Sequence, residues 1–195
     1  MKKIFKIILF TVVAVLTFCG CEKASGKVDY NSLTKKLNSD YSGWTLIVMT
    51  KKDDVTLIDI FTVKNSDTQT EIEYSIEKLS ELSFDDDNDF ITKKSGTAVI
   101  KDGKIETVNG DEVTIEIENI ATLGLSFKSE YFRNAKFSDT SFSASVTNPS
   151  GFLGKSLTCT DMTVYASFAD KFTKINITYT AENGAKIVCT YSFEG

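Results

Sequence analysis

The amino-acid sequence contains no histidine among its 195 residues. This absence removes the usual general base near neutral pH, the commonest zinc ligand and every Ser–His or Cys–His nucleophile pair. The 27 acidic residues could still supply a pair of carboxylates for glycoside hydrolysis. The sequence singles out no such pair, so we assign no catalytic residue and no cofactor, and we expect a protein without enzymatic activity.

One short segment matches part of a phosphate-binding motif. Gly154-Lys155-Ser156 has the residues that end a P-loop, but Pro149 occupies the place of the motif's first glycine. We therefore interpret the segment as a loop before a strand.

A second segment has the alternating acids of a calcium-binding loop. Asp85, Asp87 and Asp89 are the candidate ligands. The sixth place of such a loop requires glycine and the twelfth requires glutamate, but Phe90 and Gly96 occupy them. Because runs of charge are common on solvated surfaces, we favour a solvated acidic loop over a calcium site.

The first twenty residues have the pattern of a secretory signal. Lys2, Lys3 and Lys6 form a positive start, and Ile7–Phe18 is an apolar segment shorter than the roughly 20 residues of a membrane-spanning helix. A small residue precedes a cysteine at its end, which is typical of a cleaved signal. An uncleaved N-terminal anchor helix is the alternative, and the short apolar segment disfavours it.

The end of this signal resembles the lipobox of bacterial lipoproteins, in which an aliphatic residue and two small residues precede a lipidated cysteine. Residues 18–21 fit with a glycine directly before Cys21, whereas residues 16–19 place a bulky Phe18 before the cysteine. The resemblance implies a signal peptide over residues 1–20, acyl chains on Cys21 and a tether over residues 21–28. It predicts a protein anchored to the cell membrane outside the cytoplasm, because several acyl chains hold stably.

The charge of the chain limits its partners. Loss of the three signal lysines would lower the formal net charge from −5 to −8. Nucleic-acid affinity depends on phosphate contacts with a basic face, so we do not expect nucleic acid as a partner. An anionic membrane surface would also repel the domain.

The spacing of apolar residues predicts one short helix at the start of the domain, followed by strands. The helix is indicated by Tyr30, Leu33, Leu37 and Tyr41, with Asp29 or Asn31 as its N-cap. Asp102-Gly103, Asn109-Gly110 and Glu182-Asn183-Gly184 mark hairpin turns. The expected strands are 44–50, 55–63, 69–78, 96–101, 104–108, 112–119, 141–147, 156–168, 172–181 and 185–193, and residues 121–133 are ambiguous between strand and helix.

Residues 29–195 are therefore expected to form a single, mainly β domain of about ten antiparallel strands with a short N-terminal helix. The sheet could be a curved sheet, a half-barrel or a sandwich. In the last meander the turn lengths pair residues 175 with 191, 177 with 189 and 179 with 187, so that one face is apolar.

This meander predicts two free thiols. Cys189 lies beside Ile177, whereas Cys159 is two strands away and on the opposite face. Two strand spacings of about 9.5 Å exceed the limit of about 7 Å between the Cα atoms of a disulfide. We expect Cys189 to be buried.

The first hairpin differs from the others because Trp44–Met49 and Val55–Val63 are apolar on both faces. We expect the core to cover one face, and the helix or an apolar ligand to cover the other, with the helix favoured. Trp44, Leu46 and Val48 are the candidate ligand-binding residues. Asp59 interrupts the second segment, and we expect it at a sheet edge or a bulge.

A short helix before a long antiparallel run, including the hairpin Gly96–Lys104, resembles the lipoprotein-carrier half-barrels of the LolA and LppX type. In that family a curved sheet wraps a helix and encloses an apolar cavity for acyl chains. The resemblance implies such a cavity here and carries over no functional residue.

Two functions stay open. The first is a lipid-anchored protein that binds an apolar small molecule such as a lipid. The second is a surface interaction module whose acidic strands, around Glu71–Glu77 and Glu112–Glu118, contact a basic or cell-wall partner such as an envelope protein.

Overall fold

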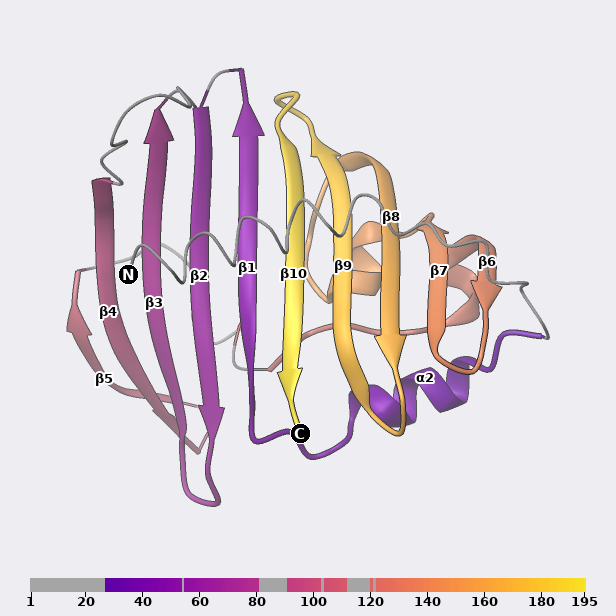
Figure 1. The fold of residues 1–195 in the computed structure, drawn as a ribbon, viewed down its shortest axis with the longest axis horizontal. Coiled ribbons are helices and arrows are strands. Elements are labelled where there is room, and N and C mark those ends of the chain that lie inside the picture. Colours follow the sequence, from indigo (N-terminus) through magenta and orange to yellow (C-terminus); the bar gives the residue numbers. More distant parts are fainter. Residues whose placement is uncertain (1–26, 54, 81–90, 103, 112–119, 121) are drawn as a thin grey trace.

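The computed structural model describes residues 27–195 except residues 54, 81–90, 103, 112–119 and 121. Ten antiparallel strands form one open, curved sheet in the order β5-β4-β3-β2-β1-β10-β9-β8-β7-β6 (Figure 1). The strands are β1 (Gly43–Lys52), β2 (Val55–Asn65), β3 (Thr70–Ser80), β4 (Ile91–Lys101), β5 (Lys104–Gly110), β6 (Phe132–Phe137), β7 (Ser141–Val146), β8 (Cys159–Phe168), β9 (Phe172–Ala181) and β10 (Lys186–Glu194). The predicted mainly β fold is confirmed, and of its three forms the curved sheet is the one observed.

Two meanders build this sheet, one over β1–β5 and the other over β6–β10. They join where β1 pairs with β10, so the first and last strands of the domain lie side by side. The predicted register of the last meander is confirmed, because residues 175, 177 and 179 pair with 191, 189 and 187.

Helix α2 (Tyr30–Leu37) precedes the sheet, as predicted. Asp29 is its N-cap, with a carboxylate oxygen that accepts a hydrogen bond from the backbone N–H of Ser32 at 3.0 Å. Leu33 and Leu37 are buried in the main core. The ammonium of Lys36 donates to the carbonyl of Ala169 in the β8–β9 turn and thereby fixes the helix to that end of the sheet.

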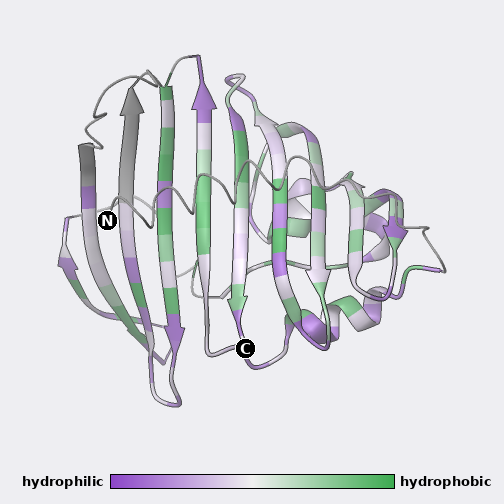
Figure 2. Ribbon diagram, viewed as in Figure 1, coloured by the Kyte–Doolittle hydropathy of each residue, from purple (hydrophilic) through white to green (hydrophobic). Residues whose placement is uncertain are grey.

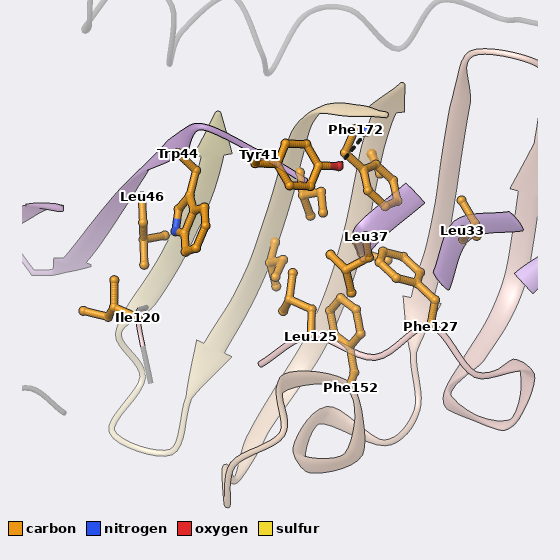
Figure 3. Close-up of a cluster of buried hydrophobic side chains, with 14 of the residues drawn as sticks. Leu33, Leu37, Tyr41, Trp44, Leu46, Ile120, Leu125, Phe127, Phe152 and Phe172 are labelled. Carbon is orange, nitrogen blue, oxygen red and sulfur yellow. Dashed lines mark hydrogen bonds between the residues drawn. The ribbon is translucent and has the colours of Figure 1, made fainter. Parts of the chain in front are cut away.

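The core lies on one face of the sheet, which we call the inner face and which carries Trp44, Val63 and Ile72 in register on β1, β2 and β3. Phe127, from a segment without helix or strand, packs at the centre of this core (Figure 3). Its ring centroid lies 5.4–5.8 Å from four other rings, which are those of Phe132, Phe142, Phe152 and Phe172. These offset and edge-on contacts add to the hydrophobic burial.

The opposite face, which we call the outer face, carries a second apolar group on the middle strands. Figure 2 shows hydrophobic stretches along the ribbons of β1, β2 and β10. Ile47, Met49, Ile60 and Val188 are half-buried there, and Ile58 is buried although it lies outside the main core cluster. The first hairpin is therefore apolar on both faces, as its sequence indicates. The expectation that the helix covers the second face is wrong, because α2 and the core share the inner face.

Helix α4 (Pro149–Leu153) was not predicted. The side chain of Asn148 caps it by accepting a hydrogen bond from the N–H of Gly151 at 2.9 Å, and Pro149 suits the first turn. Gly154 ends the helix with a left-handed φ of 64°. Gly154-Lys155-Ser156 thus lies at a helix end and in the loop before β8, in agreement with its interpretation as a loop.

A short 3-10 helix, η1 (Ser129–Tyr131), and the start of β6 account for residues 129–133 of the segment 121–133, whose type was ambiguous, whereas residues 123–128 are neither helix nor strand. The pairing of β6 with β7 is irregular between Arg133 and Lys136, and Asn134 has a positive φ of 53°. This bulge breaks the alternation by which a strand is recognised in sequence.

Cys159 and Cys189 are free thiols in the structure. The prediction that they lie on opposite faces is wrong. The register of β8 against β9 shifts between Thr160 and Thr163, so Cys159 pairs with Ala181 and packs against the inner-face core together with Cys189.

Several predictions fall outside the described residues: the signal peptide, Cys21, the calcium candidates Asp85, Asp87 and Asp89, and the strand expected over 112–119. Within the described ranges, no helix is long and apolar enough to span a membrane. The same ranges contain no group of three cysteine or acidic residues that could hold a metal ion.

Candidate functional site

A pocket of about 690 Å³ lies where α2 ends and β1 begins. It is lined by residues 37–42, by Trp44, by the β2–β3 turn at 65–67, by Leu123 and by Gly195. Pockets of roughly 300–1,000 Å³ hold most small-molecule ligands. The size of this pocket therefore fits a small molecule, and its lining divides into an apolar wall and a polar rim.

The apolar wall consists of Leu37, Tyr41, Trp44 and Leu123. Figure 3 shows that Leu37, Tyr41 and Trp44 belong to the same buried cluster as the core. The ring of Tyr41 packs against that of Phe193 at an interplanar angle of 38°, with a centroid distance of 4.6 Å. Burial raises the pKa of the Tyr41 phenol, so this hydroxyl is neutral at physiological pH.

Trp44 is held by packing alone. It is 4% exposed, and its Nε1 atom is buried with no hydrogen-bond partner in the part of the chain that the structure describes. A buried donor without a partner costs about 1–3 kcal/mol. The indole is therefore a ring fixed by its neighbours, with one donor still unpaired.

The polar rim is formed by two copies of the tripeptide Asn-Ser-Asp, at residues 38–40 and 65–67. The first copy follows α2, and the second begins at Asn65, the last residue of β2. The backbone N–H of Asn65 donates to the carbonyl of Ser42 at 2.8 Å, which joins the two turns. The chain thus brings the same three residue types to the pocket from two directions.

Side-chain hydrogen bonds make the second turn rigid. The amide nitrogen of Asn65 donates to the carbonyl of Tyr41 at 3.2 Å, and its amide oxygen accepts from the hydroxyl of Thr70 at 3.0 Å. The hydroxyl of Ser66 donates to the carbonyl of Gln69 at 2.9 Å. Because these groups are already paired, the rim is formed before any ligand binds.

The two aspartates of the rim are the groups left to contact a ligand. Within the described part of the chain, neither the Asp40 nor the Asp67 carboxylate has a hydrogen bond or an ion pair. The ammonium of Lys171 lies nearby, but it donates to the backbone carbonyl of Asp40 and sits 5.6 Å from the Tyr41 ring centre. The rim therefore presents two negatively charged carboxylates that can accept hydrogen bonds from a ligand.

The structure places the three predicted ligand residues in different surroundings. Trp44 lines the pocket, whereas Leu46 and Val48 do not. Leu46 is buried in the core at 6% exposure. Val48 is half-buried further along β1, between Asp59 on β2 and Cys189 on β10.

Asp59 does not lie at an edge or a bulge, so that prediction is wrong. Strand β2 is internal, and its register with β1 and β3 is regular at this residue. Burial raises the pKa of the Asp59 carboxyl. Burial also raises the pKa of the Cys189 thiol to about 11, an effect that Asp59 increases and Lys155 opposes.

Sequence reasoning missed the rim. The repeated Asn-Ser-Asp tripeptide is visible in the sequence, and each copy follows a predicted apolar element. Such residues are common in any turn, so the repeat acquires meaning only when the fold brings its two copies to one pocket.

No protein-family model matches the chain, and no curated protein matches it either. The site is therefore interpreted from its own geometry.

Proposed function

We propose that the protein is a non-enzymatic lipoprotein, anchored outside the cytoplasm through a lipid on Cys21, that binds a small amphipathic molecule in the pocket at the start of β1. The observation that supports binding is the two-sided lining of this pocket, with an apolar wall and a rim of free carboxylates. The lipid anchor rests on the sequence pattern of residues 1–21.

The apolar wall defines one half of the ligand. Leu37, Trp44 and Leu123 offer hydrocarbon and aromatic surface, and Tyr41 already uses its hydroxyl within the protein. An alkyl or ring portion of the ligand would remove this surface from water, which contributes about 25 cal/mol for each Å² buried.

The rim defines the other half. Asp40 and Asp67 attract ammonium groups and accept hydrogen bonds from hydroxyl groups, whereas they repel a second carboxylate or a phosphate. The favoured ligand is therefore a lipid-like amphiphile with a cationic or polyhydroxylated head. This proposal narrows the apolar ligand expected from sequence, because a bare acyl chain would leave the polar rim without partners.

A series of single-chain amphiphiles that share a dodecyl chain tests this proposal. Dodecylammonium, dodecyl maltoside and dodecanoate are titrated calorimetrically below their micelle concentrations. We expect the cationic and uncharged members to bind and dodecanoate to bind at least about tenfold more weakly, since like charges in contact cost several kcal/mol.

The double variant Asp40→Asn, Asp67→Asn should remove most of this discrimination. Asp139→Asn, in the exposed β6–β7 turn, is the matched control and should leave the order unchanged. Equal binding of all three amphiphiles by the wild type, or no binding of any, would refute the proposed ligand class.

The surface interaction module is the alternative. Glu71 and Glu73 are exposed on β3, as that hypothesis requires, and Glu71 accepts a hydrogen bond from the side chain of Gln69 at 2.9 Å. The Glu112–Glu118 strand of the same hypothesis lies outside the described residues. A basic partner would contact these two side chains rather than the pocket.

A further inference from the structure

A second group of polar side chains lies on the inner face, further along the strands than the pocket. Cys189 on β10 pairs with Val48 on β1, and Val48 pairs with Asp59 on β2. All three side chains are half-buried, and Val48 and Cys189 pack against the main core cluster. The row therefore places a carboxylate beside apolar and thiol groups that keep part of their surface exposed.

The Asp59 carboxylate has no partner in the part of the chain that the structure describes. It forms neither a hydrogen bond nor an ion pair there. Burial raises the pKa of this carboxyl, because the charged form has lost part of its hydration. Such a loss without a compensating contact is unfavourable, so an ammonium group brought by a ligand would stabilise this carboxylate.

Lys155 supplies the opposite charge from the other side of Cys189. It lies in the loop between α4 and β8, and its side chain is exposed. The strand order places β10 between β2, which carries Asp59, and β8, which this loop precedes. The hydroxyl of Ser150 accepts from the backbone N–H of Leu157 at 3.0 Å and donates to the carbonyl of the same residue at 3.2 Å, which fixes the loop. Among the described residues, the Lys155 ammonium also has no hydrogen bond or ion pair.

The thiol of Cys189 is influenced by both charges. Burial is the largest cause of its raised pKa, while Lys155 lowers this pKa and Asp59 raises it. Effects of opposite sign on one thiol place a cation and an anion near the same sulfur atom. Two strand spacings, about 9.5 Å, separate the backbones of Asp59 and Cys189, so the two charges flank the thiol from opposite sides.

An apolar surface lies between the two charges. It is formed by Val48 and Cys189 together with Ile187, which is also half-buried against the core. Methylene groups of a ligand that cover this surface remove it from water. A ligand with an ammonium at one end and a carboxylate at the other gives both Asp59 and Lys155 a partner, whereas a singly charged ligand leaves one of them unpaired.

We infer that the inner face around Cys189 is a second binding site, which takes a small zwitterion with its ammonium on Asp59 and its carboxylate on Lys155. The ligand class is an amino acid whose two charges are separated by a short apolar chain. The site does not depend on the proposed pocket, because Val48, Asp59 and Lys155 are not among the residues that line that pocket.

Protection of Cys189 from alkylation tests this inference in the full chain. The protein carries Cys159→Ser and is purified in detergent, and alkylation of Cys189 by iodoacetamide is followed by mass spectrometry of its peptide. The probes are ε-aminocaproate, hexanoate and hexylammonium at equal concentration. We expect ε-aminocaproate to slow alkylation with saturation, by at least about fivefold, and the two singly charged probes to slow it less than about twofold, because each satisfies one charge only.

Asp59→Asn and Lys155→Gln should each reduce the protection by ε-aminocaproate to that of a singly charged probe, with every rate compared with the rate of the same variant without ligand. Lys155 is exposed, so its replacement leaves the fold intact. Lys186→Gln, at an exposed position of β10 on the opposite face, is the matched control and should retain full protection. No protection of the wild type by ε-aminocaproate, equal protection by all three probes, or protection that survives both Asp59→Asn and Lys155→Gln would overturn the inference.

Discussion

The hydroxyl of Tyr41 connects the start of the first strand to both α2 and β9. It accepts a hydrogen bond from the backbone N–H of Phe172 at 3.0 Å (Figure 3). It also donates one to the carbonyl of Lys36 at 2.6 Å. One side chain therefore joins the end of α2 and the start of β1 to β9, which begins 131 residues further along the chain. Because Tyr41 also lines the pocket, this connection holds the apolar wall in place.

Replacing Tyr41 with phenylalanine should destabilise the domain by about 1–3 kcal/mol, since the buried N–H of Phe172 loses its partner. Urea unfolding at neutral pH measures the loss. Tyr165→Phe removes an exposed hydroxyl on β8 and should change stability by less than about 0.5 kcal/mol. Equal effects of the two substitutions would show that the Tyr41 hydroxyl does not hold these elements together.

Asp59 should control the reactivity of Cys189. The thiol pKa of about 11 leaves little thiolate at pH 8, and the Asp59 carboxylate contributes to that raised value. Asp59→Asn should therefore speed alkylation of Cys189 by iodoacetamide, about threefold for each half unit by which the pKa falls.

The rate is measured by mass spectrometry in a Cys159→Ser background, so that only one of the two strand cysteines reacts. Asp139→Asn serves as the control, because that carboxyl lies in an exposed turn. If neither Asp59→Asn nor Asp139→Asn changes the alkylation rate of Cys189, the Asp59 carboxylate does not influence the Cys189 thiol.

Alkaline pH should destabilise the domain through Tyr179. Burial raises the pKa of this phenol from 10.0 to about 12, with smaller contributions from Cys189 and Cys159. The unfolded chain loses the proton first, so the stabilising contribution is complete below pH 10 and falls as the pH rises towards 12. The free energy of unfolding, measured with urea between these pH values, should fall less steeply with pH in Tyr179→Phe than in the wild type. Identical slopes would contradict this assignment.

The regular parts of the fold were predictable because their signals are local. Two-residue alternation and turn residues located most strands, and the three-residue loop at 182–184 determined the register of β9 with β10. The bulges at Thr160–Thr163 and Arg133–Lys136 were not predictable, because an inserted residue reverses the alternation without a distinctive sequence. One of these bulges placed Cys159 on the unexpected face.

The candidate site was predictable only in part. Trp44, which the apolar character of β1 singled out, lines the pocket, but its neighbours there come from two turns and a distant loop. Their meeting depends on the pairing of β1 with both β2 and β10. The position of Asp59 was mispredicted for a related reason, since only the strand order shows that β2 is internal.

Lipidation of Cys21 stays a prediction from sequence. Cys21→Ser should abolish incorporation of radioactive palmitate and release the protein from the membrane fraction or leave it as precursor. Cys19→Ser should retain the label, because a bulky Phe18 precedes Cys19 where a small residue is needed. The opposite pattern of labelling would mean that the lipid is on Cys19.

The central claim is that the pocket beside Trp44 binds an amphipathic small molecule, and the fluorescence of Trp44 tests it most directly because the chain has no other tryptophan. Titration with dodecyl maltoside below its micelle concentration should shift the emission of the wild type with saturable, micromolar affinity, corresponding to about −8 kcal/mol. Ser42→Phe, which fills the pocket, should abolish the saturable shift, whereas Val48→Phe, on β1 but outside the pocket, should retain it. An emission spectrum that does not change, or that changes linearly and equally in all three proteins, would contradict the claim.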